Sequence, residues 1–290
     1  MFFKKSKNYI TLVFKGFIMG ASDIVPGVSG GTMALILGVY EKLVYSIRIL
    51  LDKESILLLL KFRFKKFFNK VPVDFLFFLG LGILLAIFSL SGPIEWLLEN
   101  KPMYVWAFFF GLVGASIFFV RNRIKKWSIK IWVLFVLGIV LAYIFSGLIP
   151  SQTPATGLLF FLSGAVAISA MILPGISGSF LLVILGKYEQ ILHAVNNRDF
   201  YTLGIFFLGI VVGIAIFVRV LSWLLKHYHD ITFAFLVGLM IGSLRKVWPW
   251  KVEGLNILPS GLNLENILIL LLIAGGFLFI YLILRIINSD

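Results

Sequence analysis

The chain has 290 residues, of which 60% are hydrophobic and only 13% are charged. Soluble globular domains carry roughly 45–50% apolar and about 25% charged residues. This composition, with a mean hydropathy of +1.05, therefore indicates an all-α integral membrane protein. The absence of cysteine excludes disulfide scaffolds, zinc–thiolate sites and cysteine nucleophiles. A net charge of +13 would suggest a nucleic-acid partner in a soluble protein, but in a membrane protein it can report orientation.

Apolar stretches divide the chain into spans and interrupted segments. A helix needs about 17–25 apolar residues to cross roughly 30 Å of hydrocarbon. Six stretches meet this length: residues 73–98, 103–120, 131–148, 201–225, 231–248 and 267–284. Two more, about 9–50 and 157–195, are each interrupted by a cluster of Pro, Gly and Ser. We interpret these two segments as re-entrant helical hairpins, and two full crossings each are the alternative.

The basic residues gather in three segments, namely the first 7 residues, residues 52–70 and residues 121–130. Because cytoplasmic loops are enriched in Lys and Arg, we expect both the N-terminus and the C-terminus on the cytoplasmic side of a multi-pass protein of the cell membrane. No nucleic-acid partner is then needed to explain the charge. This topology puts three basic residues on the extracellular side, where Lys and Arg are least expected: Arg245, Lys246 and Lys251. Residues 56–70 form either a basic amphipathic helix on the inner surface or a solvated loop.

The chain contains an internal duplication. Residues 17–45, FIMGASDIVPGVSGGTMALILGVYEKLVY, match residues 165–193, AVAISAMILPGISGSFLLVILGKYEQILH, at a shift of 148 positions. Two shorter matches follow: Phe77–Gly80 with Phe206–Gly209, and Ala107, Gly111, Leu112 and Ser116 with Ala234, Gly238, Leu239 and Ser243. Three collinear matches predict two copies of one unit. The copies occupy residues 1–150 and 151–290, each a re-entrant hairpin followed by three transmembrane helices.

The number of spans in each copy predicts their relative orientation. Each hairpin returns to the side where it began, and three spans follow it, so the second copy starts on the opposite side. Inverted repeats with broken helices at corresponding positions are a hallmark of secondary transporters, which bind substrate near the midplane where the repeats meet. The sequence therefore predicts two inverted repeats and transport by alternating access, and a homodimer is compatible with it.

Each Pro-Gly loop must leave the helical path, because proline removes a backbone donor and glycine permits a positive φ. We expect Pro26, Gly27, Pro174 and Gly175 to shape two turns that meet face to face. Hydroxyls and free N–H groups at the start of a following helix suit phosphate or carboxylate. This assigns as phosphate-binding residues Ser29, Gly30, Gly31, Thr32, Ser177, Gly178 and Ser179. The alternative is that the glycines only permit close helix crossing.

Two charged residues lie far from the predicted membrane surfaces. Asp23 stands three residues before Pro26, whereas its counterpart in the second copy is Met171. Because intramembrane carboxylates are costly and often functional, Asp23 is a candidate to carry a coupling H⁺ or Na⁺. A structural hydrogen bond to the loop is the alternative. Arg219 lies seven residues before Lys226, roughly 10 Å below the surface at 1.5 Å per residue, and we expect it to bind either the substrate phosphate or a protein carboxylate.

Tyr-Glu pairs recur in both copies, at Tyr40 and Glu41 and at Tyr188 and Glu189. About ten residues separate each pair from its loop tip, which places the pairs near a membrane surface as coupling or gating groups or as interfacial caps. The three histidines stand in or near surface turns, so we predict no metal site, no cofactor and no catalytic cluster. Residues 248–250, Trp-Pro-Trp, read as an interfacial aromatic belt, and their proline could instead shape an entrance.

The motifs PGVSGGT…LGVYE and PGISGS…LGKYE, the span that holds Arg219 and the late Trp-Pro-Trp make the chain similar to the bacterial and archaeal polyprenyl-phosphate transporters. The resemblance covers nearly the whole chain. It implies movement of undecaprenyl phosphate, the lipid carrier of cell-wall synthesis, from the outer to the inner leaflet for reuse, coupled to an ion gradient. The family-type positions in this sequence are Asp23, Pro26–Thr32, Tyr40, Glu41, Pro174–Ser179, Tyr188, Glu189 and Arg219.

We therefore expect a secondary lipid transporter, or flippase, rather than an enzyme, with a polyprenyl phosphate as its substrate partner. A transporter of a small anion would use the loops equally well, and a lateral opening between spans would distinguish the two. An intramembrane phosphatase or transferase is disfavoured because no His/Arg cluster or Asp-rich magnesium motif occurs at membrane depth. A passive channel or scaffold would show no saturable substrate and no effect of the deep charges.

Overall fold

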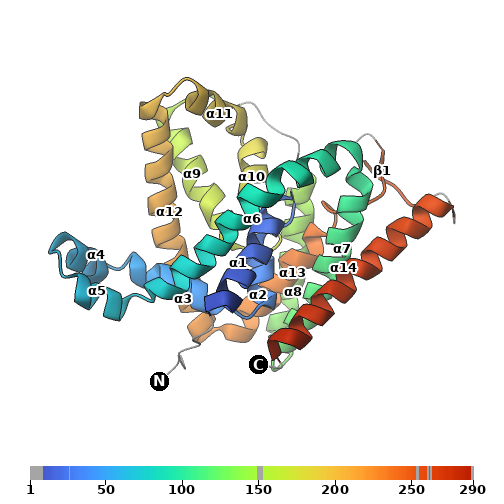
Figure 1. Cartoon of the computed structure of the whole chain (residues 1–290), viewed down its shortest axis with the longest axis horizontal. Helices are drawn as coiled ribbons and strands as arrows, with labels where there is room; N and C mark the ends of the chain where they lie inside the picture. Colours follow the sequence, from blue (N-terminus) through green and yellow to red (C-terminus); the bar gives the residue numbers. More distant parts are fainter. Residues whose placement is uncertain are drawn as a thin grey trace.

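The computed structural model describes residues 9–25, 27–148, 153–252, 255–259, 261 and 263–288, so Pro26 lies outside the described residues. Helices dominate (Figure 1). The first half contains α1 (Tyr9–Ile24), α2 (Gly30–Ile36), α3 (Tyr40–Leu50), α4 (Lys53–Leu60), α5 (Phe64–Lys70), α6 (Val73–Asn100), α7 (Pro102–Val120), η1 (Arg121–Arg123) and α8 (Ile129–Ser146). The second half contains α9 (Gly157–Ile172), α10 (Gly178–Ile184), α11 (Tyr188–Asn196), α12 (Phe200–His227), α13 (His229–Ser243), β1 (Lys251–Val252), β2 (Leu255–Asn256) and α14 (Leu264–Asn288).

Five helices of the described residues are long and apolar enough to cross a membrane, namely α6, α7, α8, α12 and α14. The expectation of an all-α membrane protein is therefore confirmed. The sixth predicted span is shorter than expected, because α13 has 15 residues and ends at Ser243. At 1.5 Å per residue it is about 22 Å long, less than the hydrocarbon thickness. The charged residues Arg245 and Lys246 and then Pro249, which cannot continue a helix, follow its end.

Each interrupted segment folds as three short helices rather than as two arms. The Pro-Gly turn separates the first two helices, and Gly27 and Gly175 have φ values of +89° and +81°. A second break separates the last two helices at Gly38 and Gly186, where φ is +69° and +62°. Glycine adopts this left-handed conformation without the steric cost that a Cβ imposes. The expected single return arm is thus bent at a Leu-Gly step that both copies contain.

Three pairs of corresponding helices in the two halves have equal lengths, whereas α3 and α11, α7 and α13, and α8 and α14 differ in length. α1 and α9 have 16 residues each, α2 and α10 have seven, and α6 and α12 have 28. A Cβ on Gly82 would clash with the carbonyl oxygen of Val13, and one on Gly209 would clash with that of Phe161, 148 positions further on. Gly80 has no such neighbour. Gly82 is therefore the counterpart of Gly209, and the sequence match between residues 77–80 and 206–209 was two positions out of register.

Four closely packed helix pairs form the framework: α1 with α6, α9 with α12, α7 with α14 and α8 with α13. The first two pairs lie within one half, and the last two join helices from different halves. Small residues let such helices approach closely. The close approaches in the two mixed pairs are Gly111 to the carbonyl of Ile273, Gly276 to that of Phe108, Gly238 to that of Phe135 and Gly138 to that of Phe235. Each half therefore packs two of its helices closely against helices of the other half.

The helices α2 and α13 lie in the interior of the protein, whereas α4 and α5 project from its surface. All residues of α2 are buried, as is most of α13. Figure 1 shows α4 and α5 projecting beside α3. The predicted amphipathic segment 56–70 is therefore a pair of short helices, separated at Phe62, which has a φ of +52°.

The expected aromatic belt at residues 248–250 is contradicted at Trp250, whose side chain is buried inside the protein. Trp250 is 7% exposed and packs against Ala107 and Ile269 of α7 and α14. Its indole N–H donates to Asn266 Oδ1 at 2.8 Å, as a buried indole requires. The Trp248 indole N–H donates to the carbonyl of Ile257 at 2.8 Å. The segment thus fixes the chain after α13 against two spanning helices.

Candidate functional site

The two Pro-Gly loops touch each other inside the protein. Ser29 Oγ lies 3.3 Å from the carbonyl oxygen of Met171 and 3.2 Å from that of Leu173. The Gly175 N–H donates to Thr32 Oγ1 at 3.0 Å. Ser29 and Thr32 are 1% and 0% exposed. The loops therefore meet face to face, and the hydroxyls of the first loop are used in holding them together.

The first loop satisfies its own polar groups. The Gly30 N–H donates to Asp23 Oδ1 at 2.6 Å, and the Gly31 N–H donates to Ser29 Oγ at 3.1 Å. Gly30 must be glycine, because a Cβ there would clash with the Asp23 carboxylate. The place at the start of α2 where the sequence predicts a phosphate is thus already occupied by a carboxylate. Four of the assigned residues, Ser29, Gly30, Gly31 and Thr32, lie in this closed arrangement.

The second loop differs because Met171 stands where the first half has Asp23. No carboxylate therefore occupies the equivalent position. Ser177 Oγ and Ser179 Oγ lie 2.9 Å apart, and Ser179 is exposed. Gly178 is buried, and a Cβ on it would lie 2.7 Å from the carbonyl oxygen of Ala167, so this glycine permits close packing against α9. The second loop presents its hydroxyls and the first does not.

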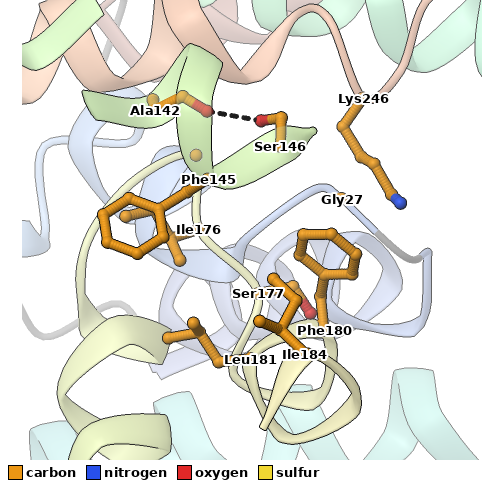
Figure 2. Close-up of a pocket in the computed structure, with 11 residues that line it drawn as sticks. Gly27, Ala142, Phe145, Ser146, Ile176, Ser177, Phe180, Leu181, Ile184 and Lys246 are labelled. Carbon is orange, nitrogen blue, oxygen red and sulfur yellow. Dashed lines mark hydrogen bonds between the residues drawn. The ribbon is translucent and has the colours of Figure 1, made fainter. Parts of the chain in front are cut away.

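A small cavity adjoins the second loop, and a lysine borders it (Figure 2). Gly27 and Gly175 of the two turns line it together with Ser177 and Lys246, and apolar side chains of α8 and α10 complete it. Lys246 Nζ lies 3.9 Å from the centre of the Phe180 ring. A Cβ on Gly27 would lie 2.7 Å from Lys246 Cγ. The ammonium side chain thus packs against the first loop and faces the helix that follows the second.

The cavity measures about 20 Å³, enough for about one water molecule. A phosphate group does not fit this volume. Side chains at its border must move to admit one, and Figure 2 shows Lys246 and Phe180 side by side at that border. The described conformation is therefore closed around the loops.

The sequence predicts a span that runs to residue 248, which puts Lys246 near its extracellular end as a misplaced charge that is not assigned to the loops. α13 ends at Ser243, so Lys246 follows the end of a short, buried helix. Lys251 is close by, since its Nζ donates to the Lys246 carbonyl and lies 4.6 Å from the Trp106 ring centre. Burial, with the Lys246 charge as a second cause, lowers the pKa of Lys251 to about 8. The signal that could have identified Lys246 is the 13-residue length of the apolar run from Ile231 to Ser243.

Arg219 does not join the loops. Its Nη2 donates to the carbonyl oxygen of Leu51 at 3.0 Å. It lines a different cavity together with Arg48 and Asp52, and none of the described residues of the two Pro-Gly loops borders that cavity. The structure therefore separates Arg219 from the other residues assigned to the phosphate.

The two Tyr-Glu pairs have different surroundings. Glu41 Oε1 lies 3.6 Å from Arg123 Nη1 and 3.6 Å from His229 Nε2. Tyr40 is 2% exposed, and its hydroxyl has no hydrogen-bond partner among the described residues. Tyr188 and Glu189 are exposed, and Glu189 borders a separate surface cavity. Within the part of the chain that the structure describes, no three His, Asp or Glu side chains gather in a way that could hold a metal ion.

Comparison with protein families gives a match that covers both loops, Lys246 and Arg219. A family model described as undecaprenyl phosphate translocase-like matches residues 19–260. A polyprenyl-phosphate transporter of Vibrio cholerae serotype O1 (strain ATCC 39315 / El Tor Inaba N16961) is 43% identical over 250 residues, which cover 85% of this chain and 80% of that protein. A polyprenyl-phosphate transporter of Staphylococcus aureus (strain NCTC 8325 / PS 47) is 31% identical over 255 residues, or 82% of this chain and 85% of that protein. No solved structure matches the chain.

Proposed function

The chain belongs to the undecaprenyl phosphate translocase-like family, and we propose on this premise that it carries a polyprenyl phosphate across the membrane. The names of the two relatives support this role, since both are polyprenyl-phosphate transporters and match more than four fifths of the chain. They also support transport rather than catalysis. The helices of the described residues provide the membrane-spanning framework that such a transporter needs.

The phosphate group binds, in this proposal, between the two loops beside Lys246. The observation that carries the proposal is the position of this cation between the loops, where the described residues place no carboxylate within salt-bridge distance of it. A half-buried ammonium favours an anionic partner, and phosphate oxygens accept strong hydrogen bonds from ammonium and hydroxyl groups. Ser177 and Ser179 supply the hydroxyls. Ser29 and Thr32 hold the loops together, and Gly30 and Gly31 permit their close contact.

The proposed direction is from the outer to the inner leaflet, for reuse of the carrier lipid. The basic segment 121–130 lies beside the start of α13, because the Lys126 N–H donates to Asp230 Oδ2 at 3.1 Å. Lys246 follows the opposite end of the same helix. If the basic segment is cytoplasmic, as the enrichment of Lys and Arg in inner loops predicts, the Lys246 end faces outward. Substrate would then enter from that side.

We further propose that residues 1–150 and 151–290 are inverted repeats that rock against each other around the loops. The equal lengths of α6 and α12 and the reciprocal glycine contacts between α7 and α14 and between α8 and α13 support a pseudo-symmetric arrangement. Coupling to H⁺ or Na⁺ would act through Asp23. A proton on this carboxylate would remove the charge that strengthens its bond to the Gly30 N–H, and so would loosen the first loop.

Transport by purified protein in liposomes tests the proposal. A fluorescent farnesyl phosphate is placed in one leaflet, and its arrival in the other is followed by protection from a membrane-impermeant quencher. Lys246→Gln should lower the initial rate about tenfold, as expected for the loss of one charge-assisted contact. The double variant Ser177→Ala/Ser179→Ala should lower it less, because two neutral hydroxyls contribute less than one charge.

Lys101→Gln is the matched control, because Lys101 is an exposed lysine at the start of α7, away from the cavity. It should transport at the wild-type rate. A Lys246→Gln variant that is folded and transports as fast as the control would refute the proposed phosphate site. Equal inhibition of wild-type transport by inorganic phosphate and by unlabelled farnesyl phosphate would favour a small-anion transporter instead.

A further inference from the structure

A second cavity opens between α3 and α12, away from the two loops. It has a volume of about 300 Å³, and six residues line it: Arg48, Asp52, Arg219, Trp223, Lys226 and His227. This volume is large enough for a phosphate group, unlike that of the cavity beside Lys246. Its lining comes from the end of α3, the turn that follows and the last third of α12.

The two guanidinium groups of this cavity are held by neutral acceptors. Arg48 Nη1 donates to Ser222 Oγ at 3.2 Å, and Arg219 Nη2 donates to the Leu51 carbonyl at 3.0 Å. A guanidinium has five N–H donors in a planar fork, so most donors of each group remain available. These hydrogen bonds therefore fix the positions of the two side chains and leave most of their N–H donors free to bind a ligand. Such fixed, planar donors match the oxygens of a phosphate.

The charges of the cavity are not balanced. Two guanidiniums and the Lys226 ammonium face a single carboxylate, Asp52, and Lys70 already binds Asp52 at 3.0 Å. Lys226 has no ion-pair partner among the described residues. Cations that border the lipid phase are stabilised by anionic partners. The excess of positive charge therefore points to an anionic ligand.

The composition of the neighbouring helices α4 and α5 indicates that this cavity lies at the level of lipid headgroups. They project from the body beside α3 (Figure 1), and the Lys70 ammonium binds both Asp52 and Glu54, which holds α5 against the start of α4. Their surface combines exposed apolar and basic side chains: Ile56, Leu57, Leu60, Phe62, Phe64 and Phe68 with Lys53, Lys61, Arg63, Lys65 and Lys66. This combination is typical of segments that lie in the membrane interface and contact anionic lipids. Trp223 lines the cavity, and tryptophan is enriched at membrane interfaces.

We propose that this cavity binds the phosphate group of a lipid in the leaflet in which α4 and α5 lie. The ligand is a lipid rather than a free ion, because Asp52 of the cavity wall binds Lys70 of α5, so that the cavity adjoins the exposed apolar side chains of α4 and α5. The headgroup belongs either to the carried polyprenyl phosphate on its way out of the protein or to a membrane phospholipid. The proposal rests on the proposed function only in taking a polyprenyl phosphate as the first ligand to test.

Binding to the full chain in detergent tests the proposal, with the number of bound lipids and the apparent Kd read by native mass spectrometry. The parent is Lys246→Gln, which removes the proposed loop site, so that the two phosphate sites are measured separately. The probes are farnesyl phosphate, phosphatidylglycerol and inorganic phosphate. Adding Arg48→Gln and Arg219→Gln to the parent should raise the apparent Kd for lipid phosphate about tenfold.

The control is the parent with Lys65→Gln and Lys66→Gln, which removes the same charge from α5 outside the cavity. It should change the Kd less than twofold. Stronger binding of farnesyl phosphate than of phosphatidylglycerol supports the proposal and assigns the site to the carried lipid. Equal binding of the two supports it and assigns the site to membrane lipid. An unchanged Kd in the cavity variant, or inorganic phosphate binding as tightly as either lipid, overturns it.

The two proposals fail independently. If Lys246→Gln loses transport while lipid binding at the second cavity is unchanged, both sites are supported and act separately. If Lys246→Gln transports normally, the loop site is contradicted. The binding measurement with the Arg48 and Arg219 variants still decides whether this cavity binds lipid phosphate.

Discussion

Asp23 and Met171 occupy equivalent positions and give the two loops different chemistry. The Asp23 carboxylate accepts the Gly30 N–H at 2.6 Å, and Met171 provides no such group. Only the first half has this carboxylate, which occupies the Gly30 N–H of the first loop. The hydroxyls of the second loop remain available to a ligand. The same hydrogen bond is the structural alternative to a coupling role, and the two roles can be separated by substitution.

Asp23→Asn keeps a carbonyl oxygen for the Gly30 N–H but cannot gain or lose a proton. We expect its melting temperature to stay near that of the wild type and its transport to lose the stimulation by an ion gradient. Asp23→Ala removes the acceptor and should destabilise the protein by about 1 kcal/mol, as the loss of a helix cap does. Melting in detergent and transport with and without a gradient measure both effects. An Asp23→Asn variant that responds to the gradient like the wild type would leave Asp23 with a structural role only.

At the scale of elements, glycine positions decide how closely the spanning helices approach. Gly275 and Gly276 are neighbours on α14, but only Gly276 faces α7, where a Cβ would clash with the carbonyl oxygen of Phe108. Gly275 has no atom within 4 Å of its Cβ position. The pair therefore offers a controlled test of the packing between the two halves.

Gly276→Leu should force α7 and α14 apart and destabilise the protein by about 1–3 kcal/mol, the range expected for overpacking. Gly275→Leu should leave the stability within about 0.5 kcal/mol, because its side chain points away from α7. Thermal unfolding and the yield of monodisperse protein report the difference. Equal stability of the two variants would contradict the close α7–α14 contact.

At the scale of the whole molecule, a polar cluster lies beside the end of α13 that is opposite to Lys246. Glu41 at the start of α3 lies near Arg123 of η1 and His229 at the start of α13, and so joins the first hairpin to the framework. Its counterpart Glu189 has no ion pair within the residues that the structure describes. In the proposed alternating access, we therefore expect Glu41 but not Glu189 to hold its end of the molecule closed.

Glu41→Gln should weaken this closure and shift the protein toward the conformation open at the basic end. Exposed ion pairs contribute about 0–1 kcal/mol, so the shift should be at most about fivefold. The chain has no cysteine, and Ser177→Cys provides one label site in the cavity. Labelling by an impermeant reagent from the Lys246 end should slow in Glu41→Gln and remain unchanged in Glu189→Gln. Equal labelling in both variants would show that Glu41 does not control the equilibrium.

Much of the fold follows from local properties of the sequence. Hydrophobic length identified five of the spanning helices, because the thickness of the bilayer fixes how many apolar residues a crossing needs. The Pro-Gly clusters identified both turns, because proline and glycine constrain the backbone wherever they stand. The repeated motifs also predicted that the two loops meet. All of these inferences can be made without information on which helices pack together.

The partners of individual side chains were decided only by the tertiary structure. Lys246 borders the loops because α13 stops at Ser243, and that end depends on the segment after it packing against α7 and α14. Arg219 faces α3 rather than the loops because α12 presents that side to the first half. Apolar length gives the depth of a residue but not the direction in which its helix faces. That direction is set by the close glycine contacts between helices, and it determines which charges share a cavity.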